Sequence, residues 1–255
     1  MPVSKSRIKF IRSLELKKFR KAESAFVAEG PKLVGDLLEH FSCRFLLATA
    51  EWLAQHPHLP VADIAEVSAD ELSRASLLKT PQQVLGVFEQ RTVVPDVSVV
   101  SRSLCLALDG VQDPGNLGTI VRVADWFGIE HIFCSPDTAD IYNPKAVQAT
   151  MGGMARVAVD YAPLPQLIGA LPADVPVYGT FLDGENIYRT PLSQGGLIVM
   201  GNEGNGISGE VERLVSRKLY IPSYPPERET SESLNVATAT AIVCAEFRRQ
   251  TVAMA

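Results

Sequence analysis

Residues 104–122 read LCLALDGVQDPGNLGTIVR and join an apolar strand to a turn-rich loop and the start of a helix. The unbroken apolar run suits a strand that is covered on both faces of a parallel sheet. In open parallel sheets, ligands bind beyond the carboxyl ends of the strands, where this loop lies. The stretch therefore predicts an α/β fold and places a candidate binding loop within it.

The alternation of apolar strands and helices continues to the end of the chain. We expect strands at 104–109, 131–134, 156–160, 176–182, 196–201 and 218–222. Helices are expected near 117–127, 144–152, 163–170, 207–215 and 233–249. Because strands that alternate with helices build βαβ units, we predict a parallel sheet covered by helices on both faces.

The first 90 residues follow a shorter α/β pattern. Apolar positions recur at near-helical spacing from residue 4 to residue 21, which predicts one amphipathic helix with a cationic polar face. Helices are then expected at 31–40, 51–55 and 69–78. Strands are expected at AFVAEG (25–30), CRFLLAT (43–49), IAEVS (64–68) and VLGVFEQ (84–90). This pattern predicts a small α/β domain.

A domain boundary is predicted at residues 91–103, RTVVPDVSVVSRS, where valine is the main hydrophobic residue and a proline disfavours regular structure. A chain of 255 residues also exceeds the usual range of roughly 100–200 residues per domain. We assign residues 1–95 to a first domain, 96–103 to a linker and 104–255 to a second domain.

Positive charge is concentrated at the N-terminus, although the whole chain carries a net charge of −5. Residues 1–22 hold eight basic residues and one acidic residue, which gives a local charge of +7. Such a run is either a solvated helix face or a surface for nucleic-acid phosphates, which Lys and Arg contact. The candidate RNA-binding residues are Lys5, Arg7, Lys9, Arg12, Lys17, Lys18 and Arg20.

Other sites and compartments are disfavoured by the sequence. The four cysteines are widely spaced, which predicts buried reduced thiols, and the histidines form no zinc-like spacing, so we expect no metal. No apolar run reaches about 18 residues, so we expect no membrane span. The N-terminus MPVSKSRIKFIRS lacks the apolar core of a signal peptide, and we expect a cytoplasmic protein.

Two polar side chains stand out within residues 104–122. Asn116 lies where the helix is expected to begin, so capping that helix is its simplest role. Arg122 lies about two turns further along among apolar residues, and a fixed arginine beside a strand end can hold a phosphate. Both are candidate site residues, with a helix cap and a solvated cation as the structural alternatives.

Two later segments also place polar residues after apolar strands. In VMGNEGNGIS (199–208), repeated glycines let the backbone approach a ligand, and Glu203 is either a site residue or a partner for loop N–H groups. These glycines do not match a P-loop or a dinucleotide fingerprint. In SLNVATATA (233–241), Ser233 is expected to cap the last helix, and Asn235 stands two residues inside it.

Taken in order, these segments resemble the motifs of the SpoU, or TrmH, family of RNA ribose 2'-O-methyltransferases within the SPOUT superfamily. The resemblance covers residues 104–248 and rests on NLGTIVR (116–122), GNEGNG (201–206), IP (221–222) and SLNVATA (233–239). The N-terminal half is similar to the family's L30e-like substrate-binding domain. That similarity rests on KKFR (17–20), FVAEGPKLV (26–34) and TPQQVLGVF (80–88).

The resemblance implies a deep trefoil knot in the C-terminal parallel sheet and a homodimer with active sites near the subunit interface. It implies methyl transfer from S-adenosylmethionine to a ribose 2'-hydroxyl of RNA, with ribosomal RNA preferred over transfer RNA. By position in the motifs, it assigns the cofactor contacts to Thr180, Gly201, Ile221 and Leu234. It assigns the catalytic set to Asn116, Arg122, Glu203, Ser233 and Asn235.

The arginine of this family is often described as a general base, but a guanidinium stays protonated in proteins and accepts protons poorly. We therefore expect Arg122 to hold an RNA phosphate and to stabilise the developing alkoxide. Asn116, Glu203 and Asn235 would orient Arg122 and the ribose. The segment SYPPERETSE (223–232) is longer than the connection expected in the family, which bears on cofactor contacts and substrate choice.

Three other functions stay open from the sequence. One is an RNA-binding protein without catalysis, which cofactor binding would separate from an enzyme. Another is a nucleotide-dependent oxidoreductase, although the chain has no strand-linked G-x-G-x-x-G followed by a ribose-binding acid. The third is a base methyltransferase of the same superfamily, which the segment SLNVATA together with Arg122 disfavours.

Overall fold

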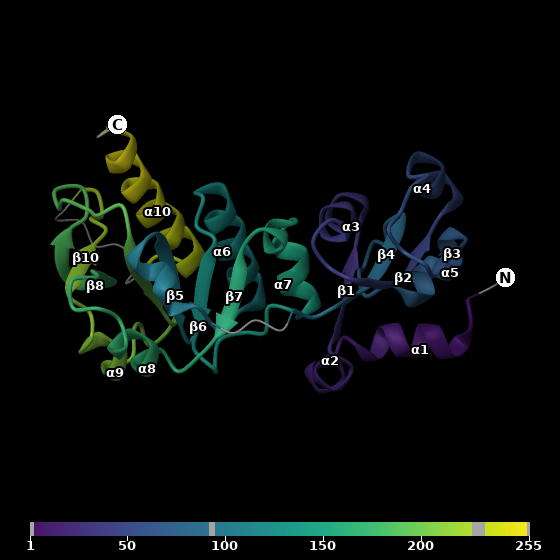
Figure 1. Cartoon of the computed structure of the whole chain (residues 1–255), viewed down its shortest axis with the longest axis horizontal. Coiled ribbons are helices and arrows are strands. Elements are labelled where there is room, and N and C mark those ends of the chain that lie inside the picture. The colour runs from purple at the N-terminus through teal and green to yellow at the C-terminus, as the bar shows by residue number, and fades with distance from the viewer. Residues whose placement is uncertain (1–2, 92–94, 226–232, 254–255) are drawn as a thin grey trace. The chain divides into compact units, whose positions relative to one another are not determined.

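The computed structural model describes residues 3–91, 95–225 and 233–253, and its chain divides into two compact units (Figure 1). The first unit contains residues 1–92 and 140–156, and the second contains residues 93–139 and 157–255. Residues 140–156 thus pack with the first unit although they come from the middle of the chain. The domain limits expected from the sequence, at residues 95 and 103, stay a prediction.

The first unit is built on a four-stranded sheet in the order β1-β4-β2-β3. β4 lies antiparallel between β1 and β2, and β3 pairs parallel with β2. An apolar core forms where Val27 of β1 and Leu85 and Val87 of β4 pack with Phe45 and Leu47 of β2. The strands are β1 (Ala25–Glu29), β2 (Cys43–Ala48), β3 (Ile64–Glu66) and β4 (Val84–Glu89). The helices are α1 (Lys5–Ser13), α2 (Lys17–Glu23), α3 (Pro31–Leu38), α4 (Ala50–Gln55), α5 (Ala69–Ala75) and, from the mid-chain segment, α7 (Pro144–Ala149) with the 3-10 turn η2 (Gly153–Ala155).

The single helix predicted for residues 4–21 is wrong, because the chain forms α1 and α2 with a break between them. Leu14 is fully buried at the C-terminal end of α1, and Leu16 is extended where α2 begins. The guanidinium of Arg20 in α2 donates to the carbonyl oxygens of Leu14 and Glu15, at 2.9 and 2.7 Å. Because these carbonyls have no helical partners, the arginine satisfies the end of α1 from the next helix.

The second unit contains a six-stranded sheet in the order β10-β8-β9-β5-β6-β7, with all of its strand pairs parallel. The predicted parallel α/β fold is therefore confirmed. The strands are β5 (Leu104–Asp109), β6 (His131–Cys134), β7 (Ala158–Tyr161), β8 (Val177–Asn186), β9 (Gly196–Gly201) and β10 (Arg217–Tyr220). The helices are α6 (Pro114–Trp126), α8 (Leu164–Gly169), α9 (Gly209–Glu212) and α10 (Val236–Ala253), preceded by the 3-10 turn η1 (Val97–Ser101).

The strand order determines which loops meet. The chain runs outward from β5 to β6 and β7, crosses to β8, and returns to place β9 between β8 and β5. Since the strands are parallel, the segments that follow β5, β8, β9 and β10 all leave from the same edge. α6 and α10 pack against one another, and α8 packs against α9 (Figure 1). The polar segments singled out in the sequence therefore converge at one edge of the sheet.

The remaining expectations concern cysteines, metals and membranes. Cys105, Cys134 and Cys244 are buried and Cys43 is half-buried, and all four are free thiols. Burial raises the pKa of Cys105 to about 11 and the pKa of Cys43 to about 12.

Within the described ranges, no cluster of three or more His, Cys, Asp or Glu side chains could hold a metal ion. No helix in those ranges combines the length and apolar character needed to cross a bilayer.

Candidate active site

The loop after β5 ends in a helix cap that leaves Asn116 free for other contacts. The carboxylate of Asp113 accepts a hydrogen bond from the backbone N–H of Asn116 at 2.8 Å, and Pro114 follows at the first helical position. The structural alternative for Asn116, that it caps this helix, is therefore wrong. Its side chain lies in the first turn of α6 and points to partners outside the helix.

Three predicted catalytic residues form a hydrogen-bond network at the sheet edge. Asn116 donates through Nδ2 to Oε1 of Glu203 at 2.8 Å, and Asn235 donates through Nδ2 to Oδ1 of Asn116 at 3.0 Å. The second carboxylate oxygen of Glu203 accepts the backbone N–H of Gln112 at 3.4 Å. Asn116 thus uses its donor and its acceptor at once, and the network joins the segments after β5, after β9 and before α10.

The loop after β9 is folded by Asn202, a residue that the sequence analysis missed. Its Oδ1 accepts the N–H groups of Gly204 and Asn205, and its Nδ2 donates to the carbonyl of Gly110 at 2.6 Å. Gly201 admits no side chain, because a Cβ there would collide with the backbone of Gly206. An amide directly after a strand-ending glycine was the available signal, since Asn readily bonds backbone groups two residues on.

The last helix is capped by Asn235, whose Oδ1 accepts the N–H groups of Ala237 at 3.0 Å and Thr238 at 3.2 Å. The helix begins at Val236, so the predicted capping role of Ser233 is wrong. Ser233 is exposed and lies against the cavity described next. Asn235 therefore fixes the start of α10 with its oxygen while it holds Asn116 with its nitrogen.

A cavity of about 670 Å³ opens beside this network. Its wall includes Glu203 and Ser233 together with all four residues to which the resemblance assigned cofactor contacts: Thr180, Gly201, Ile221 and Leu234. Apolar side chains such as Met200, Ile207 and Leu219 cover the wall between them. Residues within β8, the end of β9 and the segments that follow β9 and β10 thus build one concave site next to Asn116.

Comparison with known proteins agrees with this geometry. The model of the SpoU rRNA Methylase family matches residues 103–245, which is more than half of the chain. The chain belongs to the SpoU family. The resemblance seen in the sequence is confirmed. The first unit of this SpoU protein also matches the MRM3-like substrate binding domain at residues 5–86.

Relatives of this SpoU protein match nearly its whole length. It is 31% identical over 245 residues to the 23S rRNA (guanosine(2553)-2'-O)-methyltransferase RlmP of Bacillus subtilis, with 95% of this chain and 96% of the relative covered. A TrmH-family protein from Porphyromonas gingivalis has a TM-score of 0.86 at 42% identity, with 97% and 99% of the two chains covered. An AdoMet-bound rRNA methyltransferase from Sinorhizobium meliloti has a TM-score of 0.79 at 30% identity, with 95% and 94% covered.

The structure does not bring Arg122, the remaining catalytic candidate of this SpoU protein, into the network. Arg122 lies on α6 with an exposed side chain. No hydrogen bond or ion pair joins its guanidinium to another residue in the described ranges. The guanidinium therefore stays free to bind an external group. Residues 226–232, which include most of the long segment before Ser233, lie outside the described residues.

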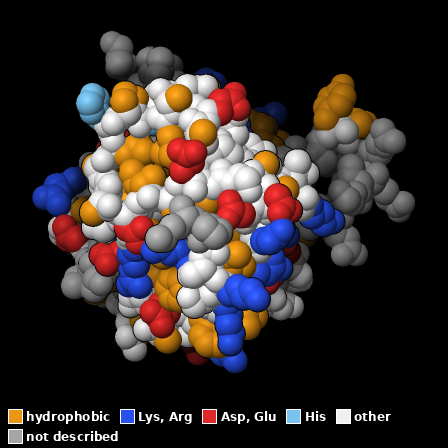
Figure 2. Space-filling view, turned by 90° about the vertical axis from the view of Figure 1, so that its right-hand side faces the viewer, with side chains coloured by type: hydrophobic (Ala, Val, Ile, Leu, Met, Phe, Trp, Pro, Cys, Tyr) orange, Lys and Arg blue, Asp and Glu red, His pale blue; other side chains and the backbone are white. Residues whose placement is uncertain are grey.

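The predicted RNA-binding residues of the SpoU protein fall into two groups. Lys5, Lys9, Lys17 and Lys18 are exposed, and Figure 2 shows Lys and Arg side chains gathered with several acidic ones on the side of α1. Arg7 is half-buried, pairs with Asp63 at 2.6 Å, and covers the ring of Phe45. Arg12 is exposed and donates to the carbonyl oxygens of Arg74 and Ser76. These four lysines form no ion pair with the residues that the structure describes, and Nζ of Lys18 lies 4.9 Å from the centroid of the Phe19 ring.

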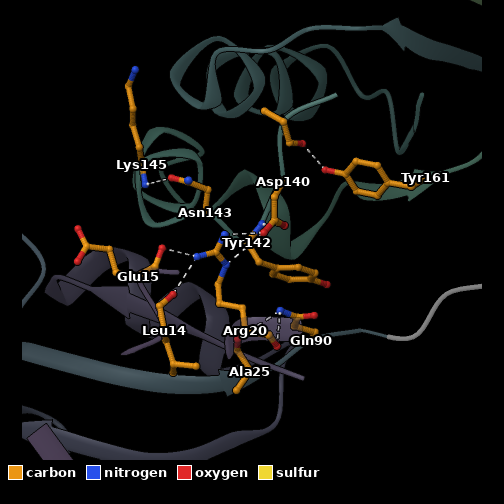
Figure 3. Close-up of polar contacts among 11 residues, drawn as sticks. Leu14, Glu15, Arg20, Ala25, Gln90, Asp140, Tyr142, Asn143, Lys145 and Tyr161 are labelled. Atoms are coloured by element: carbon orange, nitrogen blue, oxygen red, sulfur yellow. Dashed lines mark hydrogen bonds and ion pairs between the residues drawn. The ribbon is translucent and has the colours of Figure 1, made fainter. Parts of the chain in front are cut away.

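Arg20 is a correction to the predicted RNA-binding set, because only 2% of it is exposed. Besides the carbonyls of Leu14 and Glu15, its guanidinium binds Oδ2 of Asp140 through Nη2 at 2.6 Å and through Nε at 3.1 Å (Figure 3). All of these partners belong to the first unit. With its donors occupied, Arg20 cannot serve a phosphate, and its role is to hold Asp140 and the end of α1 together.

Proposed function

We propose that this protein transfers a methyl group from S-adenosylmethionine to the 2'-hydroxyl of a ribose in structured RNA, with ribosomal RNA as the substrate. The observation that carries the proposal is the hydrogen-bonded set of Glu203, Asn116 and Asn235 on the rim of the cavity in a SpoU-family fold. Methyl transfer needs an acceptor hydroxyl that is held in one orientation to the methyl group. A hydrogen-bond network of this kind provides that orientation.

The cavity fits S-adenosylmethionine by size and by lining. Pockets for ligands of this size measure about 300–1,000 Å³ and combine apolar walls with a few polar groups. Met200, Ile207 and Leu219 supply apolar wall, and Gly201 lets the ligand approach the backbone closely. We infer that Thr180, Gly201, Ile221 and Leu234 hold the cofactor. When bound, it supplies a methyl group on a positively charged sulfur.

The residues beside the cavity orient the acceptor. Glu203 and Asn235 fix the amide of Asn116 from both ends, so that it meets the ribose in one orientation. Arg122 has no partner among the described residues and holds an RNA phosphate. Its charge also stabilises the alkoxide that develops as the 2'-oxygen takes the methyl group and the hydroxyl proton passes to solvent. Ser233 lies against the cavity and contacts the bound substrate or cofactor there.

The RNA is recognised by the first unit. The lysines of α1 and α2 contact phosphates, which gives binding that depends strongly on salt and little on base sequence. The relative from B. subtilis acts on 23S rRNA, and this supports ribosomal RNA over transfer RNA.

We further propose a cytoplasmic homodimer whose C-terminal sheet carries a deep trefoil knot, as in the SPOUT superfamily. Light scattering on the purified protein tests the dimer, which a monomer mass would contradict.

The test is transfer of tritiated methyl from S-adenosylmethionine to total RNA and ribosomal particles from cells that lack this protein. We expect label at one alkali-resistant 2'-O-methyl position. Arg122→Ala is expected to lose the label, and Arg122→Lys to lose most of it, because lysine lacks the planar fork. Near-normal turnover in Arg122→Lys would contradict the proposed role of Arg122.

The same experiment separates the other functions. Cofactor binding without label in any RNA would point to a different acceptor. Absence of cofactor binding would favour an RNA-binding protein without catalysis. Label on a base instead of a ribose would identify a base methyltransferase.

A further inference from the structure

Strand β8 carries an irregular stretch of five residues at the wall of the cavity. β10 pairs Lys218 with Gly179 and the next residue, Leu219, with Glu185, so residues 180–184 have no partner in β10. The residues on either side of this stretch pair with adjacent residues of β10, Lys218 and Leu219. Gly184 also packs closely on β10, because a Cβ there would collide with the backbone of Leu219. Residues 180–184 therefore form a wide bulge within β8, which we call the wall loop.

The wall loop forms one side of the cavity. Thr180, Phe181 and Leu182 line the cavity, and 76% of Leu182 is exposed. The residues before the loop pair with β9 as well as β10, whereas residues 180–184 pair with neither strand. Without ladder partners, residues 180–184 depend on their side-chain contacts for part of their position. The shape of the cavity thus depends on whatever fastens the loop.

Lys218 supplies the polar contacts of the loop, and the side chain of Phe181 also packs against the apolar core of the second unit. Its Nζ lies 3.2 Å from Oδ2 of Asp183 and 4.6 Å above the ring of Phe181, both in the wall loop. It also lies 2.6 Å from Oε1 of Glu212, which lines the cavity from α9. One ammonium therefore joins three side chains from two walls of the same cavity. Its three N–H donors suit this arrangement, since an ammonium can serve several acceptors at once.

We propose that Lys218 is a positioning residue that sets the cavity wall and thereby the affinity for S-adenosylmethionine. Lys218 does not line the cavity itself and acts through Phe181 and Glu212, which do. The wall loop is anchored at its start by Thr180, whose hydroxyl lies 4.0 Å from the sulfur of Met200. Its tip depends on Lys218. The identity of the ligand rests on the proposed function, whereas the fastening of the loop rests on these contacts alone.

The test compares Lys218→Met with wild type by calorimetric titration of S-adenosylhomocysteine. Methionine keeps the apolar stem and removes the charge, so we expect about five- to tenfold weaker binding from the loss of two part-exposed ion pairs and one ring contact. Lys218→Arg is expected to bind within about threefold of wild type, because its fork reaches both carboxylates. Arg217→Met is the matched control on the same strand and should bind normally.

Two further readouts separate positioning from general stability. Hydrogen exchange without ligand should be faster at residues 180–184 in Lys218→Met, while the thermal midpoint changes little. In steady-state methylation, the KM for S-adenosylmethionine should rise while kcat and the KM for RNA stay constant. If Lys218→Met fails to fold, Asp183→Asn tests the same loop, because 71% of the Asp183 side chain is exposed and its loss does not threaten the core.

The outcomes are distinct. Unchanged S-adenosylhomocysteine affinity in both Lys218→Met and Asp183→Asn would overturn the inference and leave the proposed function standing. An equal loss of affinity in Arg217→Met would also overturn it, because the effect would then belong to the strand as a whole. A wild-type protein that binds no S-adenosylhomocysteine would overturn the proposed function and this inference together.

Discussion

Asn116 is the residue on which three separate segments of the second unit depend. Its amide nitrogen binds Glu203 and its amide oxygen accepts from Asn235, so neither end can be changed without loss of a partner. In Asn116→Asp, a carboxylate would face Glu203 at the present 2.8 Å contact, where like charges repel. We expect kcat to fall about 100-fold, since a small misplacement near the reacting atoms has that effect.

Single-turnover methylation of the identified RNA measures this loss. Thr119→Val is the control on the same helix, because it removes a hydroxyl that bonds only within α6, to the carbonyl of Gly115. S-adenosylhomocysteine affinity should stay normal in Asn116→Asp. Turnover near that of wild type would show that the network does not position the acceptor.

At the residue scale, the sequence singled out three residues that the structure brings together, but it did not predict their contacts. The sequence motifs alone predict Asn116, Glu203 and Asn235 as catalytic residues. The sequence could not decide which side chain caps which helix, because Asp113 and Asn116 are both good caps and only the backbone conformation selects one. Arg20 was misassigned for a related reason, since charge alone does not show that a guanidinium is buried.

Helix α10 carries an acid whose ionisation stabilises the fold. Oε1 and Oε2 of Glu246 accept from Arg249 at 2.7 Å, and this pair lowers the pKa of the Glu246 carboxyl from its usual 4.5. A carboxyl with a lowered folded-state pKa adds stability above its unfolded pKa and loses it as the pH falls through the folded value. Glu246→Gln should therefore lower the free energy of unfolding by about 0.5–1 kcal/mol at pH 7, given that Arg249 is mostly exposed.

Urea unfolding at pH 7 and at pH 3 checks the prediction, and the difference between the two proteins should be smaller at the lower pH. Glu210→Gln, on the exposed surface of α9, is the control and should leave the pH dependence unchanged. If the loss of unfolding free energy in Glu246→Gln were equally large at pH 3, lost packing and not lost charge would be responsible.

At the element scale, periodicity predicted strands and helices where local sequence and tertiary packing agree. β5, β6 and β9 have the expected bounds, since a buried parallel strand is a continuous apolar run. The sequence pattern did not predict the break between α1 and α2. The helical spacing of apolar residues continues through the break, which depends on the burial of Leu14. The wall loop was equally hidden, since the bulge is set by pairing with β10.

The first unit is held together by an ion pair between residues far apart in the chain. Arg20 is buried and binds Asp140, of which 16% of the side chain is exposed. Removing one partner leaves an uncompensated charge, so Arg20→Met should destabilise this unit by about 3–5 kcal/mol. The double variant Arg20→Met with Asp140→Leu should recover part of that loss, because both charges are then gone while the carbonyls of Leu14 and Glu15 still lack their donor.

Urea unfolding followed by hydrogen exchange at residues 140–156 measures both effects. Arg7→Met is the control, since its pair with Asp63 is more exposed and should contribute at most about 1 kcal/mol. Equal destabilisation by the single and double Arg20 variants would contradict the ionic explanation.

Binding of the whole molecule to RNA should respond to salt through the lysines of α2. Each phosphate contact contributes about 0.7–0.9 to the slope of log K against log salt. Lys17→Ala with Lys18→Ala should therefore make that slope less steep by about 1.4–1.8. Filter binding across a salt series measures it. Lys32→Ala, which removes an exposed lysine paired with Asp36 on α3, should leave the slope unchanged.

The mid-chain segment of the first unit has a consequence for how the protein is made. Residues 140–156 supply Asp140 to Arg20 and Tyr142 to the ring of Phe26, with 4.9 Å between the ring centroids. A ribosome adds about 5–20 residues per second, so roughly 3–13 s separate residue 91 from residue 156. During that interval the nascent unit exposes an arginine and an aromatic surface that are buried in the finished unit. The N-terminal half therefore finishes folding only after synthesis of the methyltransferase half has begun.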